Sequence, residues 1–473
     1  MNYYELRELV AQIIPRVSRL VDVKQHVGAV KEKGRKTEYK EFKLTEGEFV
    51  KQERLLSLDE VNSFVEVSCR AAACPMPLNI DTWDGLLCPF GCKYCYANAF
   101  RASLYTAFFD NSKTMSYRHC NAIKYKRELD ALLLHRDKDP HGILPNASVQ
   151  RAIAMGIPMR FGIRFEDFLD EEGTQKISLE LLRYLADNDY PLMINTKSAL
   201  VGRKDYVEAL ARNKAGAAVH VTLISSNNGL LSELEPGAPS YRARLKTMKA
   251  LADAGVRVVA RIEPYLVFIN DKQEEVERYI EDVWDTGCRN ITFDTWSYTA
   301  KNPGIRQSFY NMGFDWDRLF LLGCDSQAIG SLLLGKFMDL FRAKGFSCST
   351  FDTGNVSDND QTICCEVGDW FKGGWNYGCT VMASRFVSGR KGKPTRWKQF
   401  KKYVDKHGGF LSTALEVQVH EMWNATGTQS AYSQAWSRGL EAVGYDEDGI
   451  VWRFNTDGSD FRENLLEDVL HGL

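Results

Sequence analysis

The chain has 473 residues, of which 60 are basic and 62 acidic, so its net charge at pH 7 is −2. A chain so nearly neutral has no global charge to drive binding to nucleic acid or to a membrane surface. No apolar run reaches the ~18 residues that a membrane span needs. The length exceeds one ordinary hydrophobic core, so the chain is expected to form two domains or one enlarged barrel.

The first residues predict an amphipathic helix that ends near Pro15. Apolar residues recur there at helical spacing, namely Leu6, Leu9, Val10, Ile13 and Ile14. The stretch lacks the apolar core of a secretory signal. Twelve cysteines in a chain without an export signal indicate a reducing compartment and metal use. We expect a cytoplasmic protein with no membrane partner, in which residues 1–78 form an N-terminal extension.

A regular alternation of strands and helices follows. Strand-like segments are predicted at 79–86, 158–165, 191–196, 218–225, 257–263 and 290–294. Amphipathic helices separate them, such as 177–187 and 241–254. Unbroken apolar strands between helices are typical of a parallel sheet covered by helices. Crossover chirality closes such units into a barrel or part of one, with the chemistry at the carboxyl ends of the strands.

The predicted fold class is therefore α/β, with a partial (β/α)6 TIM-like barrel over residues 79–305. Residues 96–156 are expected to form a mostly helical insertion. The alternation is expected to stop near residue 305, and 326–344 to form one helix. Residues 306–473 then make a mixed C-terminal region that serves as a substrate or auxiliary region on the open side of the barrel.

Three cysteines follow the first predicted strand: Cys88, Cys92 and Cys95 in the spacing C-x₃-C-x₂-C, with Gly91 between them. Thiolates so arranged bind a soft metal centre and fit iron–sulfur chemistry. A [4Fe–4S] cluster takes four ligands, so three cysteines leave one iron open to a small molecule. The alternatives are half of a zinc site and structural thiols. A structural zinc needs four protein ligands, and no second C-x-x-C or H-x₃-H lies nearby.

With Tyr94 before its last cysteine, the motif resembles the signature of the radical S-adenosylmethionine (radical SAM) enzymes. Two later runs resemble the spore photoproduct lyase-like group: residues 234–256, which contain Glu235-Pro-Gly-Ala-Pro239 and Arg244, and residues 262–271, which end in Asn270-Asp271. The similarity covers roughly residues 79–300.

The resemblance implies a chemistry. The three cysteines would hold three irons of a [4Fe–4S] cluster, and SAM would chelate the fourth. An electron from a reductant such as flavodoxin or ferredoxin would then cleave SAM to a 5′-deoxyadenosyl radical, which abstracts a hydrogen atom from substrate.

A SAM site needs a cation for the carboxylate and polar groups for the ribose. The run Asn195-Thr196-Lys197-Ser198 resembles the "TKS" stretch of the same group, and this match implies that Lys197 contacts the SAM carboxylate. The alternative is a surface lysine in a loop. Other cofactor-binding candidates stand at strand ends or in the motif itself: Tyr94, Glu166, Asp167, Ser225, Arg261 and Glu263.

Each of these candidates has a structural alternative. Ser225 could cap a turn, as serine often does. Arg261 and Glu263 could form a salt bridge inside the barrel. Of Glu166 and Asp167, we expect one to point inward, and the sequence does not say which.

One departure from the group bears on the reaction. Spore photoproduct lyase returns a hydrogen atom to its product from a cysteine near the second strand. No cysteine occurs here between Cys120 and Cys288, so modification of a substrate is favoured over dimer repair.

Further thiols lie near the C-terminus, and three readings of them stay open. Cys364, Cys365 and Cys379 are candidates for a catalytic, radical-quenching thiol. Alternatively, Cys348, one of the Cys364–Cys365 pair and Cys379 could bind a second metal centre, or all could be ordinary buried cysteines. An iron count would separate a second cluster from the other two readings.

Residues 388–403 carry seven basic residues, three aromatic residues and no acid. Basic groups neutralise phosphates and aromatic rings stack on unpaired bases, so this stretch predicts a nucleic-acid partner. A solvated loop before a basic helix is the alternative. The predicted function is hydrogen abstraction from a nucleic-acid base or nucleotide. Two alternatives stay open, a radical SAM maturase of a peptide or small metabolite, and a non-enzymatic, metal-stabilised nucleic-acid-binding module.

Overall fold

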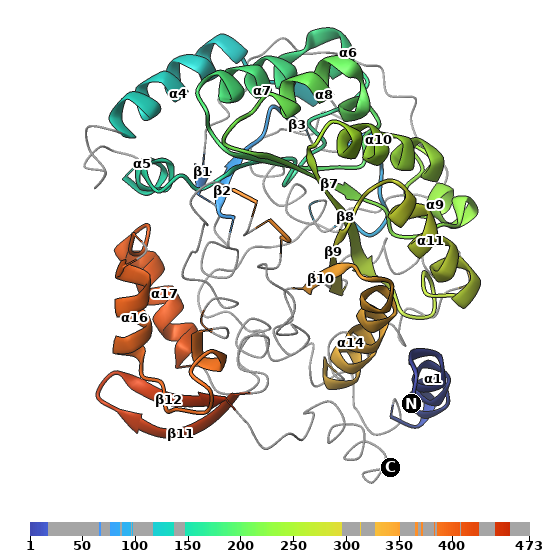
Figure 1. Ribbon diagram of the computed structural model, residues 1–473, viewed down its shortest axis with the longest axis vertical. Helices are drawn as coiled ribbons and strands as arrows, with labels where there is room; N and C mark the ends of the chain where they lie inside the picture. The colour runs from blue at the N-terminus through green and yellow to red at the C-terminus, as the bar shows by residue number, and fades with distance from the viewer. Residues whose placement is uncertain are drawn as a thin grey trace, which may run out of the picture.

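A curved parallel sheet with helices along its outside forms the centre of the protein (Figure 1). The computed structural model describes residues 1–17, 66–67, 76–85, 88–95, 97, 117–136, 147–295, 313, 327–350, 365–367, 370–371, 383, 386–406, 408–424 and 440–454. Within these residues, no helix is long and apolar enough to cross a membrane.

The main sheet has the strand order β1-β2-β5-β6-β7-β8-β9-β10. All neighbours from β2 to β10 are parallel, and β1 pairs antiparallel with β2. The strands are β1 (Glu66–Val67), β2 (Leu78–Ile80), β5 (Met159–Phe161), β6 (Leu192–Thr196), β7 (Ala217–Thr222), β8 (Arg257–Tyr265), β9 (Asn290–Thr295) and β10 (Ser347–Thr350). The predicted α/β class is confirmed, and the sheet is open, with β1 and β10 at its two ends.

Helices connect the parallel strands, as the alternation predicts. They are α4 (Ala122–Arg136), α5 (Ala147–Ala154), α6 (Glu172–Gln175), α7 (Ile177–Asp187), η1 (Leu200–Gly202), α8 (Lys204–Ala211), α9 (Asn228–Leu234), α10 (Tyr241–Asp253) and α11 (Gln273–Asp285). The predicted helices at 177–187 and 241–254 are α7 and α10. The N-terminal helix α1 (Tyr3–Val17) buries Leu6 and Val10, and it continues past Pro15.

The first predicted strand, 79–86, is in fact two. β2 ends at Ile80, and β3 (Trp83–Gly85) pairs antiparallel with β4 (Tyr117–His119) in a separate small sheet. The cause is a buried carboxylate: Asp167 Oδ1 accepts hydrogen bonds from the backbone N–H groups of Thr82, at 2.7 Å, and Trp83, at 3.0 Å. These bonds turn the backbone out of the main sheet. The described part of the predicted helical insertion contains β4 as well as α4 and α5.

The alternation does not stop at residue 305. The predicted helix 326–344 is α14 (Gln327–Lys344), and it leads into β10, which pairs parallel with β9. Phe337 and Phe341 of α14 pack their rings against Phe293 of β9. The sequence of β10, Ser-Cys-Ser-Thr, has no apolar run that would predict a strand. β10 comes from the predicted C-terminal region, yet it extends the main sheet. The division into 1–78, 79–305 and 306–473 stays a prediction.

The two faces of the sheet differ in chemistry. Phe161 of β5 lies against Phe168, which packs on Tyr206 of α8, so its register row faces the helices. That row is apolar and continues through Ile194, Val219 and Val258. The alternate residues face the concave side, and many are polar: Asn79, Arg160, Asn195, His220, Arg261, Thr292 and Ser349. The inner face is therefore more polar than the face that the helices cover.

A small unit near the C-terminus packs around aromatic rings. It contains α16 (Trp397–Lys406), α17 (Thr413–Trp423) and the hairpin of β11 (Leu440–Asp446) and β12 (Gly449–Phe454). The ring of Trp423 lies 5.7 Å from that of Trp397 and 5.4 Å from that of Phe400. In Figure 1 this unit lies at the lower left, below α5, and Arg151 of α5 donates to Gly408 O, between α16 and α17, at 3.3 Å.

Candidate active site

The three motif cysteines lie in one short loop, residues 88–95. Cys92 is buried, and Cys88 and Cys95 are half-buried. Gly91 takes a positive φ of 58°, which suits glycine. Turn hydrogen bonds run from Gly91 N to Cys88 O at 3.0 Å and from Cys95 N to Cys92 O at 3.2 Å. Burial raises the pKa of the Cys92 thiol, and the charge of Lys197 opposes that rise.

A turn after α9 holds this cysteine loop from one side. Lys93 N donates to Leu234 O at 2.9 Å, and Gly237 N donates to Phe90 O at 3.0 Å. A Cβ at position 237 would lie 2.2 Å from Pro89 O, so only glycine allows this approach of the two backbones. The run that begins at Glu235 thus packs directly against the cysteine loop. In the sequence, only a family resemblance draws attention to this run.

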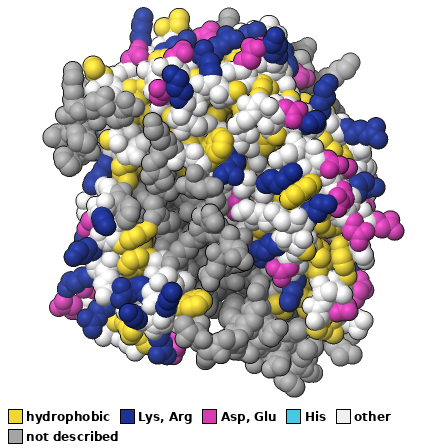
Figure 2. All heavy atoms as spheres, in the orientation of Figure 1, with side chains coloured by type: hydrophobic (Ala, Val, Ile, Leu, Met, Phe, Trp, Pro, Cys, Tyr) yellow, Lys and Arg dark blue, Asp and Glu magenta, His cyan; other side chains and the backbone are white. Residues whose placement is uncertain are grey.

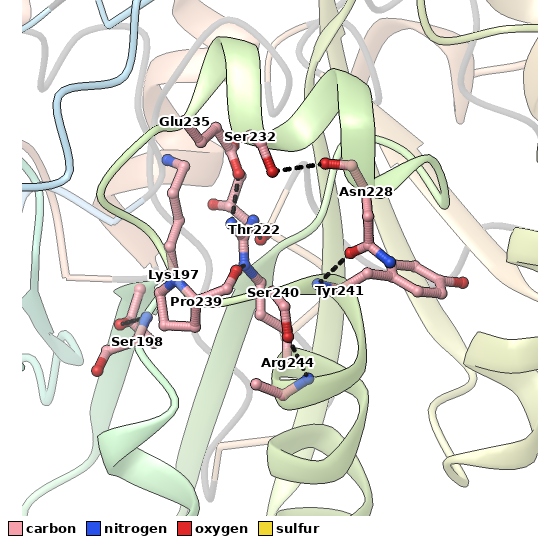
Figure 3. Close-up of polar contacts among 12 residues, drawn as sticks. Lys197, Ser198, Thr222, Asn228, Ser232, Glu235, Pro239, Ser240, Tyr241 and Arg244 are labelled. Atoms are coloured by element: carbon pink, nitrogen blue, oxygen red, sulfur yellow. Dashed lines mark hydrogen bonds and ion pairs between the residues drawn. The ribbon is translucent and has the colours of Figure 1, made fainter.

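A buried polar network links the same turn to the sheet (Figure 3). The Tyr94 hydroxyl donates to Glu235 Oε1. Arg244 Nη2 lies 2.5 Å from Glu235 Oε2, and the two side chains are 1% and 0% exposed. Arg244 also donates to the carbonyl oxygens of Pro239, at 2.8 Å, and Thr222, at 3.0 Å. From the sequence alone, Glu235 and Arg244 are motif residues without an assigned role. Their role is to anchor Tyr94, and with it the cysteine loop, to the end of β7.

Lys197 follows β6 directly and lies beside this network (Figure 3). Its Nζ is 5.5 Å from the centroid of the Tyr94 ring, within the range of a cation–π contact. Burial tends to lower the pKa of Lys197, but the charges of Cys92, Glu235 and Cys95 outweigh it and raise the pKa. Lys197 therefore carries a positive charge next to the cysteine loop.

Glu166 and Asp167 are both buried and engaged within the protein. Glu166 accepts hydrogen bonds from Thr196 Oγ1, at 2.6 Å, and from Lys197 N, at 3.1 Å. Asp167 accepts from Gly162 N at 2.6 Å, in addition to its bonds that turn the chain after β2. Burial raises the pKa of each carboxyl group. These contacts tie together the carboxyl ends of β2, β5 and β6.

The other strand-end candidates have protein partners too. Ser225 Oγ accepts a hydrogen bond from Asn227 N at 3.0 Å, the turn contact that was the alternative to a ribose contact. Arg261 and Glu263 form an ion pair, and their side chains are 23% and 22% exposed. Ligand contacts by these three residues stay a prediction.

The C-terminal thiols are only partly described. Cys364 and Cys379 lie outside the described residues. Cys348 is fully buried on β10, at a position that alternates with the inward Ser347 and Ser349. Cys365 is half-buried, and its backbone hydrogen-bonds the ring of His220 on the inner face. Over the described part of the chain, no three His, Cys, Asp or Glu side chains converge as ligands of a single metal ion. A radical-quenching thiol and a second metal centre stay predictions.

The nucleic-acid prediction for 388–403 is wrong about two of its three aromatic residues, Trp397 and Phe400. Trp397 and Phe400 are 6% and 0% exposed because they face α17 and β12, and Tyr403 is half-buried against Phe386. Trp397 and Phe400 therefore offer no face to a base, and a stacking role of the half-buried Tyr403 stays a prediction. Several cations of the stretch also have acidic partners: Arg396 pairs with Asp446, Lys398 with Asp448 and Lys401 with Glu416. Figure 2 shows Lys and Arg mixed with Asp and Glu over this unit, at the lower left.

No family model matches the chain. It is 23% identical over 238 residues to uncharacterized proteins of Mycobacterium tuberculosis and Mycobacterium bovis, a match that covers 49% of this chain and 64% of each relative. The chain thus spans less than two thirds of the length of these relatives.

Comparison with solved structures gives matches of low similarity. Spore photoproduct lyase complexed with dinucleoside spore photoproduct matches with a TM-score of 0.37 and 15% identity, over 56% of this chain and 67% of that one. Streptococcus suis SuiB bound to S-adenosylmethionine matches with a TM-score of 0.37 and 16% identity, over 59% of this chain and 52% of that one. Because these TM-scores are low, the function of the chain is inferred below from its own residues.

Proposed function

We propose that this chain is a radical SAM enzyme that binds a [4Fe–4S] cluster through Cys88, Cys92 and Cys95. The observation that carries the proposal is the loop itself. Three thiols lie within eight residues of one loop, which two backbone hydrogen bonds fix to a neighbouring turn. Three soft thiolate donors suit iron–sulfur chemistry and leave one iron for SAM. When bound, the cluster and SAM supply a 5′-deoxyadenosyl radical that takes a hydrogen atom from substrate.

The residues around the loop have distinct roles in this proposal. Lys197 offers its charge to the SAM carboxylate, and Tyr94 packs between Lys197 and Glu235. Glu166 and Asp167 act as positioning residues, because their oxygens hold the strand ends that carry Lys197 and the start of the loop. The substrate lies on the polar inner face of the sheet, and a flavodoxin or ferredoxin supplies the electron.

Reductive SAM cleavage tests the proposal. The protein is reconstituted anaerobically with iron and sulfide, reduced with dithionite and assayed for 5′-deoxyadenosine. The wild-type chain should bind roughly four irons and form 5′-deoxyadenosine. Cys92→Ala should do neither, whereas Cys120→Ala, outside the loop, should do both. Iron binding without 5′-deoxyadenosine would leave a metal-stabilised module and contradict the enzyme, and about eight irons would reveal a second cluster.

As substrate we propose a nucleobase or nucleotide, modified rather than repaired. Residues 388–403 then contribute charge alone, through exposed cations such as Lys391, Lys393 and Lys402. Replacing these three by alanine should lower the slope of oligonucleotide affinity against salt by up to ~0.7 per lost phosphate contact for a single strand. An unchanged slope would remove this stretch from the proposal and favour the maturase alternative.

A further inference from the structure

The inner face of the sheet carries buried polar groups whose hydrogen-bonding capacity is unused. Asn195 Oδ1, His220 Nε2, Thr292 Oγ1 and Ser349 Oγ have no hydrogen-bond partner among the residues that the structure describes, and their residues are at most 8% exposed. A buried polar atom without a partner costs free energy that a hydrogen bond would recover. Four of them on one concave face indicate a partner that binds there.

The four residues form two cross-strand pairs on this face. Asn195 of β6 is the cross-strand neighbour of His220 on β7, and Thr292 of β9 is the neighbour of Ser349 on β10. Between the pairs lies β8, whose Arg261 adjoins Thr292 and holds Glu263. All lie on the face opposite the helices. Asn195 is two residues before Lys197, so this polar surface adjoins the cysteine loop.

A segment from the C-terminal region covers the amino end of the same face. Glu366 Oε2 accepts hydrogen bonds from Asn290 Nδ2, at 3.0 Å, and from Ser347 Oγ, at 2.7 Å, each at the start of its strand. Trp370 Nε1 donates to Ala217 O, at 2.9 Å, at the start of β7. By register, Asn195 and His220 share a row with Asn290 and Ser347. Thr292 and Ser349 lie two residues nearer to the carboxyl end of the sheet, where the cysteine loop begins.

The tautomer of His220 sets the kind of ligand. The backbone of Cys365 forms a hydrogen bond with the His220 ring. Since Nε2 has no partner among the described residues, this hydrogen bond is to Nδ1. A carbonyl accepts from Nδ1–H, which leaves a lone pair on Nε2. Burial, with nearby Arg261, Arg160 and Arg257, lowers the pKa of His220 and keeps the ring neutral. His220 Nε2 and Asn195 Oδ1 are thus two adjacent acceptors, and Thr292 and Ser349 add hydroxyls that can donate or accept.

From this geometry we propose that the inner face binds an uncharged substrate group with neighbouring N–H or O–H donors, such as an imide or a primary amide, through Asn195, His220, Thr292 and Ser349. At the Asn195–His220 pair an anion is disfavoured because both atoms are acceptors, and nearby Arg261 is paired with Glu263. The inference rests on the proposed function, since it places the substrate beside the cluster loop, and it narrows the substrate class. An imide belongs to a nucleoside and a primary amide to a peptide side chain.

The stability of variants tests the site without a ligand. Thr292→Val removes a hydroxyl that has no partner and keeps the shape, so the midpoint of thermal unfolding should hold or rise. Thr196→Val is the matched strand variant, because its hydroxyl donates to Glu166, and its midpoint should fall. A fall for Thr292→Val as large as that for Thr196→Val would show a structural hydroxyl and overturn the proposal.

Calorimetric binding tests the ligand class, with oxidised, cluster-loaded protein and no reductant. The probes are uridine, N-acetylglutamine amide and inorganic pyrophosphate. At least one neutral probe should bind, with affinity lowered about tenfold in Asn195→Leu and unchanged in Thr247→Val, whose hydroxyl bonds Ala243 O within α10. Which neutral probe binds decides between nucleoside and peptide amide.

Failure of both neutral probes, tighter binding of pyrophosphate, or equal binding by Asn195→Leu would overturn the proposal. Because no reductant is present, these outcomes are independent of 5′-deoxyadenosine formation. If the protein cleaves SAM but binds neither neutral probe, only the proposed neutral-ligand site is wrong. If the protein binds a probe at the inner face but forms no 5′-deoxyadenosine, only the proposed radical chemistry is wrong.

Discussion

Arg244 and Glu235 form an ion pair in which Nη2 and Oε2 are 2.5 Å apart and both side chains are almost completely buried. Glu235 also accepts the Tyr94 hydroxyl, and Arg244 reaches two backbone carbonyl groups. A buried pair is a poor source of stability, but removing one partner leaves a charge without compensation. This pair joins the cysteine loop to the sheet.

Glu235→Gln should therefore destabilise the protein by about 3–5 kcal/mol, because Arg244 stays charged and buried. Urea unfolding followed by circular dichroism measures the loss. Asp253→Asn is the control, since it breaks the exposed Lys249–Asp253 pair and should cost no more than about 1 kcal/mol. Similar small losses for both variants would contradict the anchoring role of Glu235.

Gly237→Ala should prevent the cysteine loop from taking its position, because the new Cβ would lie 2.2 Å from Pro89 O. The variant should retain less iron and sulfide per chain than the wild type after reconstitution. Gly444→Ala is the matched control, since a Cβ there meets nothing within 4 Å. Full iron loading of Gly237→Ala would show that the turn does not position the cysteines.

Lys197→Met should weaken SAM binding by about tenfold to a hundredfold, the loss of one charge-assisted hydrogen bond to a carboxylate. Isothermal titration of the reconstituted protein with SAM measures the effect. Lys204→Met, on the exposed surface of α8, should bind SAM as the wild type does. If the two variants bind equally, Lys197 does not contact SAM.

His220 makes stability depend on pH. Burial, with Arg261 and Arg160, holds the pKa of His220 well below its ordinary value of 6.5. Below pH 6.5 the unfolded chain binds a proton at this residue that the folded chain does not, so stability falls as the pH falls. The loss is about 1.4 kcal/mol for each pH unit. His220→Gln should escape it.

Unfolding in urea near pH 7.5 and near pH 5.5 checks this. Between the two, the wild type should lose about 1.4 kcal/mol more than His220→Gln. Equal losses in the two proteins would mean that His220 is not held neutral in the folded state.

Phe400→Ala should cost about 3–5 kcal/mol of stability, because the ring is fully buried and lies 5.4 Å from that of Trp423. Lys402→Ala, on the exposed side of the same helix, should change stability by less than about 0.5 kcal/mol. A Phe400→Ala protein with normal stability and weaker oligonucleotide binding would restore the stacking role that the structure denies.

Local spacing in the sequence was enough for much of this protein. The cysteine spacing and Gly91 concern neighbours along the chain, so the loop that they form could be predicted. Helices α7 and α10 follow from apolar residues at helical spacing, and the strands β5 to β9 follow from the apolar runs between helices.

Tertiary packing decided the rest, because the partners are far apart in sequence. The bond from Tyr94 to Glu235 spans 141 residues and that from Thr82 to Asp167 spans 85, and no local pattern encodes either. β10 is a strand only because the edge of β9 offers it hydrogen bonds. From the sequence, Trp397 and Phe400 are predicted to stack on bases, but in the structure α17 and β12 bury them. The sequence shows which residue types are present, but their burial and their partners, which determine their roles, depend on the tertiary structure.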